Sequence, residues 1–256
     1  MTAARVALLV LAAAALALLL LPFLALAHAG IAAAWRLAPG DWRAIRVSIG
    51  YTFLACGIIA VLATPAAYWL ARSAFRGKVV VEALVLLPLL TPPLALGILL
   101  SSLFGPYGFL GKFFAHWNVD LTNSAPAFVL AQVYAAAPYY LIAARVAFAN
   151  VPRELEEAGL TLGLNRWQVF GHVTVPLAAM GLAVALALAW VRALGEFGVA
   201  LIIAYFPQGV PVKLWVNLND YGLRSVYPLL WLFFLMALPV PMVLLLISQK
   251  RFGGGH

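Results

Sequence analysis

The charged residues that could do chemistry fall in two places along the chain. Glu154, Glu156 and Glu157 lie together in a polar segment between long apolar stretches, and they are three of only 8 acidic residues. Membrane-surface helices that bind anionic lipid carry Lys and Arg on their polar face, so this acidic cluster favours a protein partner instead. The second place is the pair Arg192 and Glu196, which lie one helical turn apart within an apolar stretch and are therefore expected to form an ion pair.

The composition places both sets of charges in a membrane protein. Of 256 residues, 66% are hydrophobic and 9% are charged, whereas soluble domains are about half apolar and about a quarter charged. The net charge is +8, but the cations are scattered at the ends of apolar segments, which excludes a nucleic-acid-binding face. Because the single cysteine, Cys56, lies in an apolar run and the histidines are dispersed, we expect neither a disulfide within the chain nor a metal site.

The apolar segments predict about six transmembrane helices, since a membrane-spanning helix needs about 20 mainly apolar residues. The candidate segments are 6–31, 45–70, 80–104, 126–148, 174–206 and 226–248. Several contain proline, which spanning helices tolerate. We therefore expect an all-α integral membrane protein with a single transmembrane domain over residues 1–256. Its core is expected at about 45–248, and a flexible C-terminal tail at 250–256.

The distribution of Lys and Arg predicts the orientation of the chain in the membrane. With the N-terminus inside, nine of these residues fall on the cytoplasmic side and six outside, as expected when cytoplasmic loops carry the excess. Both termini and the polar loop at about 150–172 are then cytoplasmic. Gly105 to Lys112 is one residue too long for a phosphate-binding loop, so no catalytic residue is assigned.

The loop at 150–172 carries the signals of two short surface helices. Asn150 and Pro152 favour a helix start, and Gly163 suits the left-handed position that ends a helix. Asn165 and Gln168 have the spacing of a capping box that begins the second helix. The small residues between these signals would let another surface approach the backbone closely.

This loop resembles the EAA loop of ABC importer permeases. Glu157, the following alanine, Gly163 and Pro176 occupy the positions of that pattern, while Gly159, Val173 and Val175 depart from it by small or apolar replacements. The resemblance implies a cytoplasmic coupling helix that sits in a groove of an ATPase subunit. The coupling residues would be Glu154, Glu157, Ala158, Gly159, Gly163 and Pro176.

The resemblance extends over about residues 45–248 to the permeases of molybdate, tungstate and sulfate importers. It is carried by the runs at 105–112 and 192–198, and the segments 204–207 and 220–223 are more similar to the molybdate and tungstate branch. It implies a type I ABC importer permease that forms a homodimer in a prokaryotic inner membrane. Its expected partners are two cytoplasmic ATPase subunits, which bind ATP and Mg, and an extracytoplasmic oxyanion-binding protein. This chain would bind no cofactor and hydrolyse nothing itself.

Two interpretations of the intramembrane charges stay open. In the first, Arg192 holds a tetrahedral oxyanion through several N–H donors, Glu196 keeps it from trapping the anion, and Gly195 and Gly198 allow a bend in this translocation path or gate. In the second, the ion pair only fixes helix packing at a dimer interface. Other polar residues in the spans, such as Thr52, are expected mainly to form hydrogen bonds between helices.

Four alternatives to a molybdate or tungstate permease are retained. Sulfate or thiosulfate is the first rival as substrate, and another small solute is the second. A self-sufficient secondary transporter would be favoured by inverted repeats and by broken helices at matching positions in the two halves, which the sequence does not show. A membrane scaffold without transport is the fourth.

Overall fold

The computed structural model describes residues 3–32 and 35–252, which form helices and connecting segments with no strand among them. The helices are α1 (Ala3–Ala32), α2 (Asp41–Arg72), α3 (Lys78–Leu90), α4 (Pro93–Phe104), α5 (Phe109–Ala115), α6 (Ala125–Ala149), α7 (Arg153–Thr161), α8 (Arg166–Val169), η1 (Phe170–Thr174), α9 (Val175–Leu194), α10 (Gly198–Ile203), α11 (Val210–Tyr221), η2 (Leu223–Ser225), α12 (Val226–Ala237) and α13 (Pro239–Phe252). The all-α membrane fold is confirmed.

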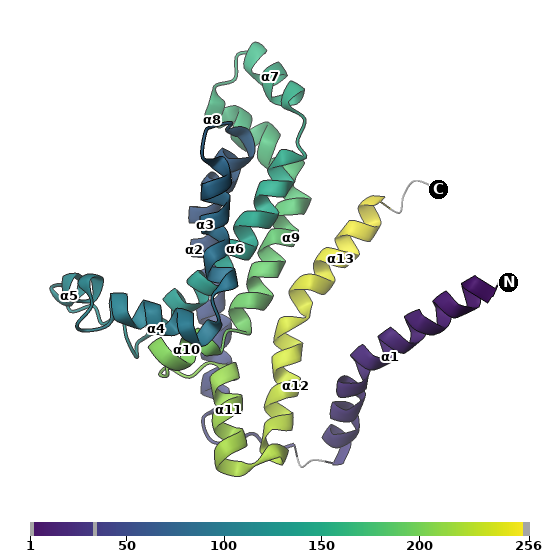
Figure 1. The fold of residues 1–256 in the computed structure, drawn as a ribbon, viewed down its shortest axis with the longest axis vertical. Coiled ribbons are helices and arrows are strands. Elements are labelled where there is room, and N and C mark those ends of the chain that lie inside the picture. The colour runs from purple at the N-terminus through teal and green to yellow at the C-terminus, as the bar shows by residue number, and fades with distance from the viewer. Residues whose placement is uncertain (1–2, 33–34, 253–256) are drawn as a thin grey trace.

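Helices α2, α6 and α9 lie side by side and form the centre of the molecule (Figure 1). Their shared core is rich in alanine, with Tyr140 and Phe148 as the large buried side chains. Small residues let membrane helices approach closely. A Cβ atom on Gly181 of α9 would lie only 2.4 Å from the Cβ atom of Ala147 on α6. Close backbone contact, rather than large side chains, therefore holds this core together.

Polar side chains in the core connect the helices, as the sequence predicted. Gln132 on α6 donates one hydrogen bond to Thr52 Oγ1 on α2 at 2.8 Å and another to the carbonyl oxygen of Ala193 on α9 at 3.1 Å. Thr64 and Tyr140 share a hydrogen bond of 2.7 Å between α2 and α6. In the bilayer such groups find no water, so these bonds supply partners within the protein, although the buried Oε1 atom of Gln132 has no partner among the described residues.

The prediction of one continuous helix over 80–104 is wrong. The segment forms two helices, α3 and α4, that meet at an angle of 106°. Thr91 and Pro92 each precede a proline, and both adopt extended backbone conformations, with ψ of 125° and 138°. The residue before a proline is driven out of the helical region, so two prolines in succession end α3 at Leu90. With this bent pair counted as one span, the described residues contain up to six.

The span predicted at 174–206 also breaks. It ends as α9 at Leu194, and the chain turns through residues 195–197 before α10 begins. The span predicted at 226–248 is interrupted only at Leu238, between α12 and α13, and Leu238 keeps helical backbone angles (φ −72°, ψ −35°), so Leu223–Val243 still counts as one candidate span. Because α13 continues to Phe252, residues 250–252 of the expected flexible tail are helical. The rest of that tail, residues 253–256, lies outside the described residues.

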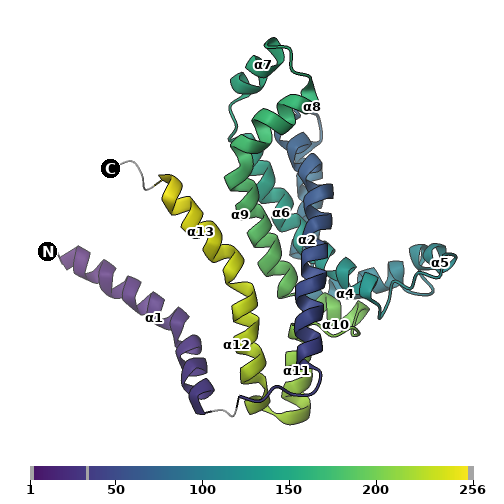
Figure 2. The same cartoon turned by 180° about the vertical axis from the view of Figure 1, so that it is seen from behind.

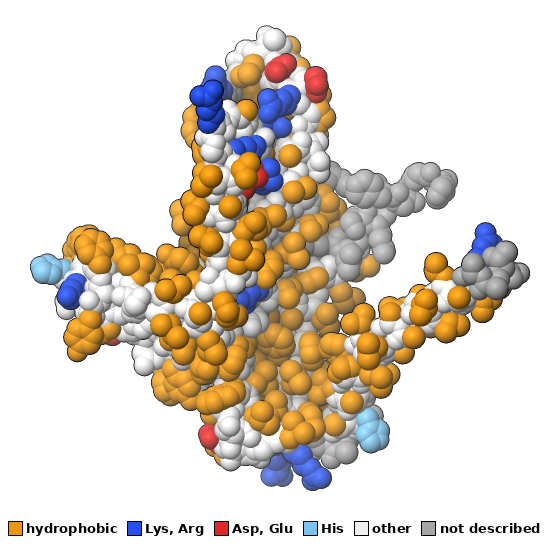
Figure 3. Space-filling model, viewed as in Figure 1, with side chains coloured by type: hydrophobic (Ala, Val, Ile, Leu, Met, Phe, Trp, Pro, Cys, Tyr) orange, Lys and Arg blue, Asp and Glu red, His pale blue; other side chains and the backbone are white. Residues whose placement is uncertain are grey.

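Helix α1 stands at the edge of the molecule, next to α12, and leans away from the central helices (Figures 1 and 2). It touches α12 where Phe23 packs against Phe234. Most of its apolar side chains are exposed, which suits a helix surrounded by lipid. Figure 3 shows hydrophobic side chains over the middle of the molecule, with charged side chains at its upper and lower ends and a few at the tips of its two side arms.

Candidate functional site

A short helix, α7, caps one end of the central helices and belongs to the polar segment of residues 150–172, which we call the α7 loop (Figure 2). The predicted start of this helix is wrong by two residues, since the cap expected at Asn150 lies at Pro152. Asn150 ends α6 instead of capping α7, and Pro152 is the residue immediately before α7, with an extended conformation at ψ 131°. Proline cannot continue α6, so the chain turns at Val151 and Pro152 and starts again at Arg153.

The end of α7 and the start of α8 follow the prediction. Gly163 has φ +91°, a conformation that glycine adopts without steric cost. Its N–H donates to the carbonyl oxygen of Leu160, and the N–H of Leu164 donates to the carbonyl oxygen of Gly159. This pair of hydrogen bonds is the pattern that closes a helix C-terminus. Asn165 and Gln168 form the reciprocal capping box. Local sequence therefore fixes the shape of this half of the loop.

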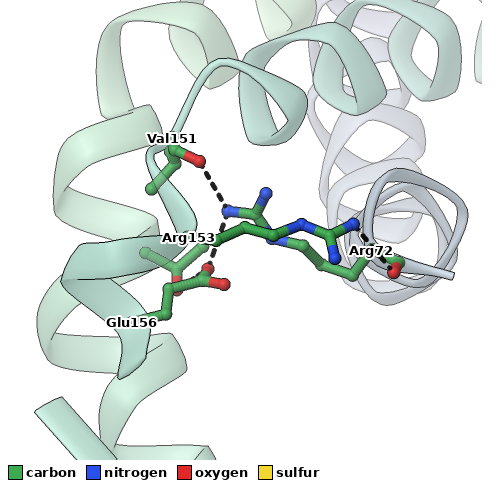
Figure 4. A network of polar contacts seen from close by, with 5 residues as sticks. Arg72, Val151, Arg153 and Glu156 are labelled. Atoms are coloured by element: carbon green, nitrogen blue, oxygen red, sulfur yellow. Dashed lines mark hydrogen bonds and ion pairs between the residues drawn. The ribbon is translucent and has the colours of Figure 1, made fainter. Parts of the chain in front are cut away.

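The buried centre of the loop is Glu156, which the sequence analysis did not assign to the site. Its Oε1 atom accepts hydrogen bonds from Arg72 Nη2 at 2.9 Å and from Thr174 Oγ1 at 2.6 Å (Figure 4). Arg72 Nη2 also donates to the Val151 carbonyl oxygen at 3.0 Å, and Arg153 donates to the Arg72 carbonyl oxygen at 3.3 Å. The network thus ties the α7 loop to the end of α2 and to the turn that precedes α9.

The assigned residues of the loop divide between its surface and its interior. Gly159 is buried, and a Cβ atom there would lie 3.1 Å from Val169. Its small size therefore serves close packing within the loop. The other residues assigned to coupling are exposed: Glu154, Glu157, Ala158, Gly163 and Pro176.

Several apolar side chains on the outer face of the α7 loop are exposed. Leu155 and Leu160 are each nearly half exposed, and Leu162 and Trp167 are more than four-fifths exposed. A cavity of about 630 Å³ opens beside them, between the loop and the end of α2, and its wall includes Arg72, Glu156, Glu157 and Trp167. An exposed surface that mixes apolar and acidic groups in this way fits a protein partner better than lipid.

The second candidate site is the pair Arg192 and Glu196 at the end of α9. The predicted ion pair between them is confirmed. The Glu196 side chain is 1% exposed and that of Arg192 is 25% exposed. Glu196 also accepts a hydrogen bond from the backbone N–H of Val199 at 2.7 Å, so it joins the end of α9 to the start of α10. The Arg192 guanidinium lies 5.9 Å from the centre of the Tyr139 ring, within the range of a cation–π contact.

Arg192 and Glu196 line a cavity of about 570 Å³ together with Gly195, Gly198 and the proline-rich segment 88–94. The break between α3 and α4 and the break between α9 and α10 therefore meet at one place. The continuous apolar segments of the sequence did not reveal these two breaks, at 91–92 and 195–197. Broken membrane helices around a polar cavity are typical of transport proteins. Across residues 3–32 and 35–252, no cluster of three or more His, Cys, Asp or Glu could hold a metal.

Gly198 lies at the start of α10, where it packs closely against the start of α4. We predict that Gly198→Ala destabilises the protein. A Cβ atom at Gly198 would lie 2.6 Å from the Cβ atom of Pro93, and overpacking of this kind costs about 1–3 kcal/mol. The thermal midpoint of the detergent-solubilised protein should fall. Gly57→Ala in α2 is the matched control, because a Cβ atom there has no neighbour within 4 Å in the described structure. Equal midpoints for both variants would contradict the close contact.

The fold and the cavity define a polytopic membrane transport protein. Residues 63–252 match the family described as the inner membrane component of binding-protein-dependent transport systems, and the chain belongs to that family. A probable molybdenum ABC transporter permease of Haloferax volcanii is 44% identical over 164 residues, which cover 64% of this chain and 60% of that protein. This chain therefore spans less than two thirds of that relative.

Other relatives share more of their length with this chain. A molybdate/tungstate transport system permease of Thermococcus kodakarensis is 35% identical over 188 residues, which cover 73% of this chain and 70% of that protein. A sulfate transport system permease of Synechocystis is 27% identical over 214 residues, covering 82% and 77%. Among solved structures, a bacterial alginate ABC transporter superposes with a TM-score of 0.62 at 18% identity, over 85% of this chain and 81% of that one. That likeness concerns the fold.

Proposed function

We propose that this chain is the permease subunit of an ATP-driven importer of a tetrahedral oxyanion, molybdate or tungstate. The observation that carries the proposal is Arg192, a partly buried cation in the wall of a cavity where two broken helices meet. A guanidinium offers several N–H donors to an oxyanion, and Glu196 limits how tightly the anion is held. The similarity to permeases named for molybdate and tungstate supports this substrate class.

The α7 loop is the proposed contact with the ATPase. Glu154, Glu157 and Ala158 are exposed on a short helix beside uncovered leucines, and the loop matches the pattern of the coupling loop of ABC importers. In this arrangement the α7 end faces the cytoplasm, as do both termini. ATP and Mg bind in the ATPase, and this subunit supplies the path through the membrane.

The assembly that follows from this proposal is a homodimer of the permease with two ATPase subunits and an extracytoplasmic binding protein. ATP binding would draw the ATPase subunits together, and the α7 loops would move with them. The binding protein would deliver the oxyanion from outside, so the cavity beside Arg192 needs only modest affinity. Discrimination among nearly isosteric anions would then rest with the binding protein.

Purification from native membranes in mild detergent tests the proposal. We expect the chain to copurify with a stoichiometric ATPase subunit, in a complex sized for two copies of each. After reconstitution in liposomes with the binding protein, this complex should take up radiolabelled molybdate only when ATP is present, and excess tungstate should compete. Competition by sulfate but not by tungstate would favour the sulfate alternative. A chain that purifies alone and transports without ATP would overturn the proposal in favour of a secondary transporter.

A further inference from the structure

The ion pair between Arg72 and Glu156 is the only one that the described structure shows within the α7 loop network. We propose that this pair is the linkage that carries the movement of α7 to the membrane-spanning helices. The inference rests on the proposed function, because it takes the ATPase as the partner of α7. Arg72 lies outside the loop motif and is here a positioning residue.

Apolar packing holds α7 only weakly. Of its nine described residues, Glu156 and Gly159 are buried. Chain turns flank the helix, at Val151 and Pro152 before it and at Gly163 after it. A helix with so little buried apolar surface takes its position from its polar contacts, so the anchor of α7 is the carboxylate of Glu156.

One carboxylate oxygen connects α7 to two other helices. Arg72 is the last residue of α2, and Thr174 is the last residue of η1, a π-helical segment that continues without a break into α9. Both donate to Oε1 of Glu156. Arg72 also bonds to the carbonyl oxygen of Val151, just beyond the end of α6. A displacement of α7 therefore acts on all three helices that form the molecular core.

The pair is protected from water and keeps an unused donor. The side chains of Arg72 and Glu156 are 14% and 12% exposed, so salt screens their attraction weakly. The Nε atom of Arg72 is buried, and among the described residues it has no hydrogen-bond partner. Arginine can bind a carboxylate through two parallel N–H groups. A shift of α7 could thus change the present single-oxygen contact into a two-donor contact without breaking the pair.

The experiment measures uptake and ATP hydrolysis in the same reconstituted complex, purified with its ATPase and binding protein. We expect Arg72→Gln to keep the ATPase bound, because the exposed face of α7 is unchanged. Molybdate transported per ATP hydrolysed should fall by about tenfold or more, the factor expected when a hydrogen bond to a charged group is lost. Thr174→Val, which removes one of the two donors to Glu156, should cause a smaller loss of the same kind.

Three comparisons make the result decisive. Arg76→Gln, at an exposed arginine four residues further along the chain, should leave the transport ratio unchanged. The exchange variant Arg72→Glu with Glu156→Arg should recover part of the ratio that Arg72→Gln loses. If Arg72→Gln yields too little complex, Glu156→Gln provides the same test with almost no change of shape.

A wild-type ratio in both Arg72→Gln and Glu156→Gln would overturn the linkage and leave the proposed function intact. Release of the ATPase by Arg72→Gln would overturn it as well, because Arg72 would then be needed for docking itself. By contrast, a wild-type permease without any bound ATPase would contradict the proposed function. The two failures are therefore distinguishable.

Discussion

Glu157→Lys should release the ATPase from the permease and abolish ATP-driven oxyanion uptake. Glu157 is exposed on α7, at the glutamate position of the coupling-loop pattern, so its carboxylate is placed to meet a cation of the partner. Loss of one partner of a charge pair buried in an interface costs about 2–5 kcal/mol, and each 1.4 kcal/mol is a factor of ten in affinity. Reversal of the charge adds repulsion. Quantitative copurification of the ATPase with the variant is the measurement.

Two further variants show whether this loss is specific to the α7 surface. Asp220→Lys reverses an exposed acidic residue on α11, at the opposite end of the molecule (Figure 1), and should keep the ATPase bound. Gly163→Asp should act like Glu157→Lys, because φ +91° at this position strains any side chain, so the substitution would distort the end of α7 and add a charge to its exposed surface. Full uptake in both Glu157→Lys and Gly163→Asp would refute the assignment of α7 as the coupling helix.

Arg192→Ala should reduce oxyanion uptake by at least about tenfold while the permease stays dimeric, since each hydrogen bond to a charged group is worth about 1.5–3 kcal/mol. The single variant leaves Glu196 as a buried carboxylate without its cation, which costs about 3–5 kcal/mol of stability. The double variant Arg192→Ala with Glu196→Gln removes that charge. It should regain thermal stability but not uptake.

The pair of measurements separates the two interpretations of these charges. Uptake in liposomes reports the path, while light scattering of the purified protein reports the dimer. If Arg192→Ala dissociates the dimer, or if the double variant regains uptake together with stability, the ion pair serves packing. A stable, dimeric and inactive double variant assigns Arg192 to the translocation path.

The sequence predicted those features that depend on neighbours along the chain. Gly163 ends α7 in a left-handed conformation, and Asn165 with Gln168 caps α8, because each of these motifs is complete within about six residues. The ion pair between Arg192 and Glu196 was predictable for the same reason, because the two residues lie four positions apart on one helix. Asn150 is not the N-cap of α7, because α6 extends to Ala149 and Asn150 is its C-cap. Pro152 then separates α6 from α7.

Features that depend on distant contacts escaped prediction. Glu156 was one of three glutamates, and its burial depends on Arg72, which lies 84 positions away. Its spacing from Gly159 could have indicated it, since residues three apart share a helix face. The breaks at 91–92 and 195–197 escaped prediction because membrane helices often tolerate proline and glycine. The two breaks are held in place by the packing of α4 against α10, a contact between segments that are distant in the sequence.

The two arms of the bent span differ in how much side-chain change they can absorb. Within this chain α3, described in full, buries none of its residues, and Glu82 binds it to Arg145 of α6 at 2.7 Å. Helix α4 instead presses Gly97 against Ile202, where a Cβ atom would come within 2.9 Å. The apolar residues of α3 should therefore vary in size as long as they stay apolar, whereas α4 should tolerate almost no enlargement at its contact with α10. Mutational tolerance should change abruptly at Pro92.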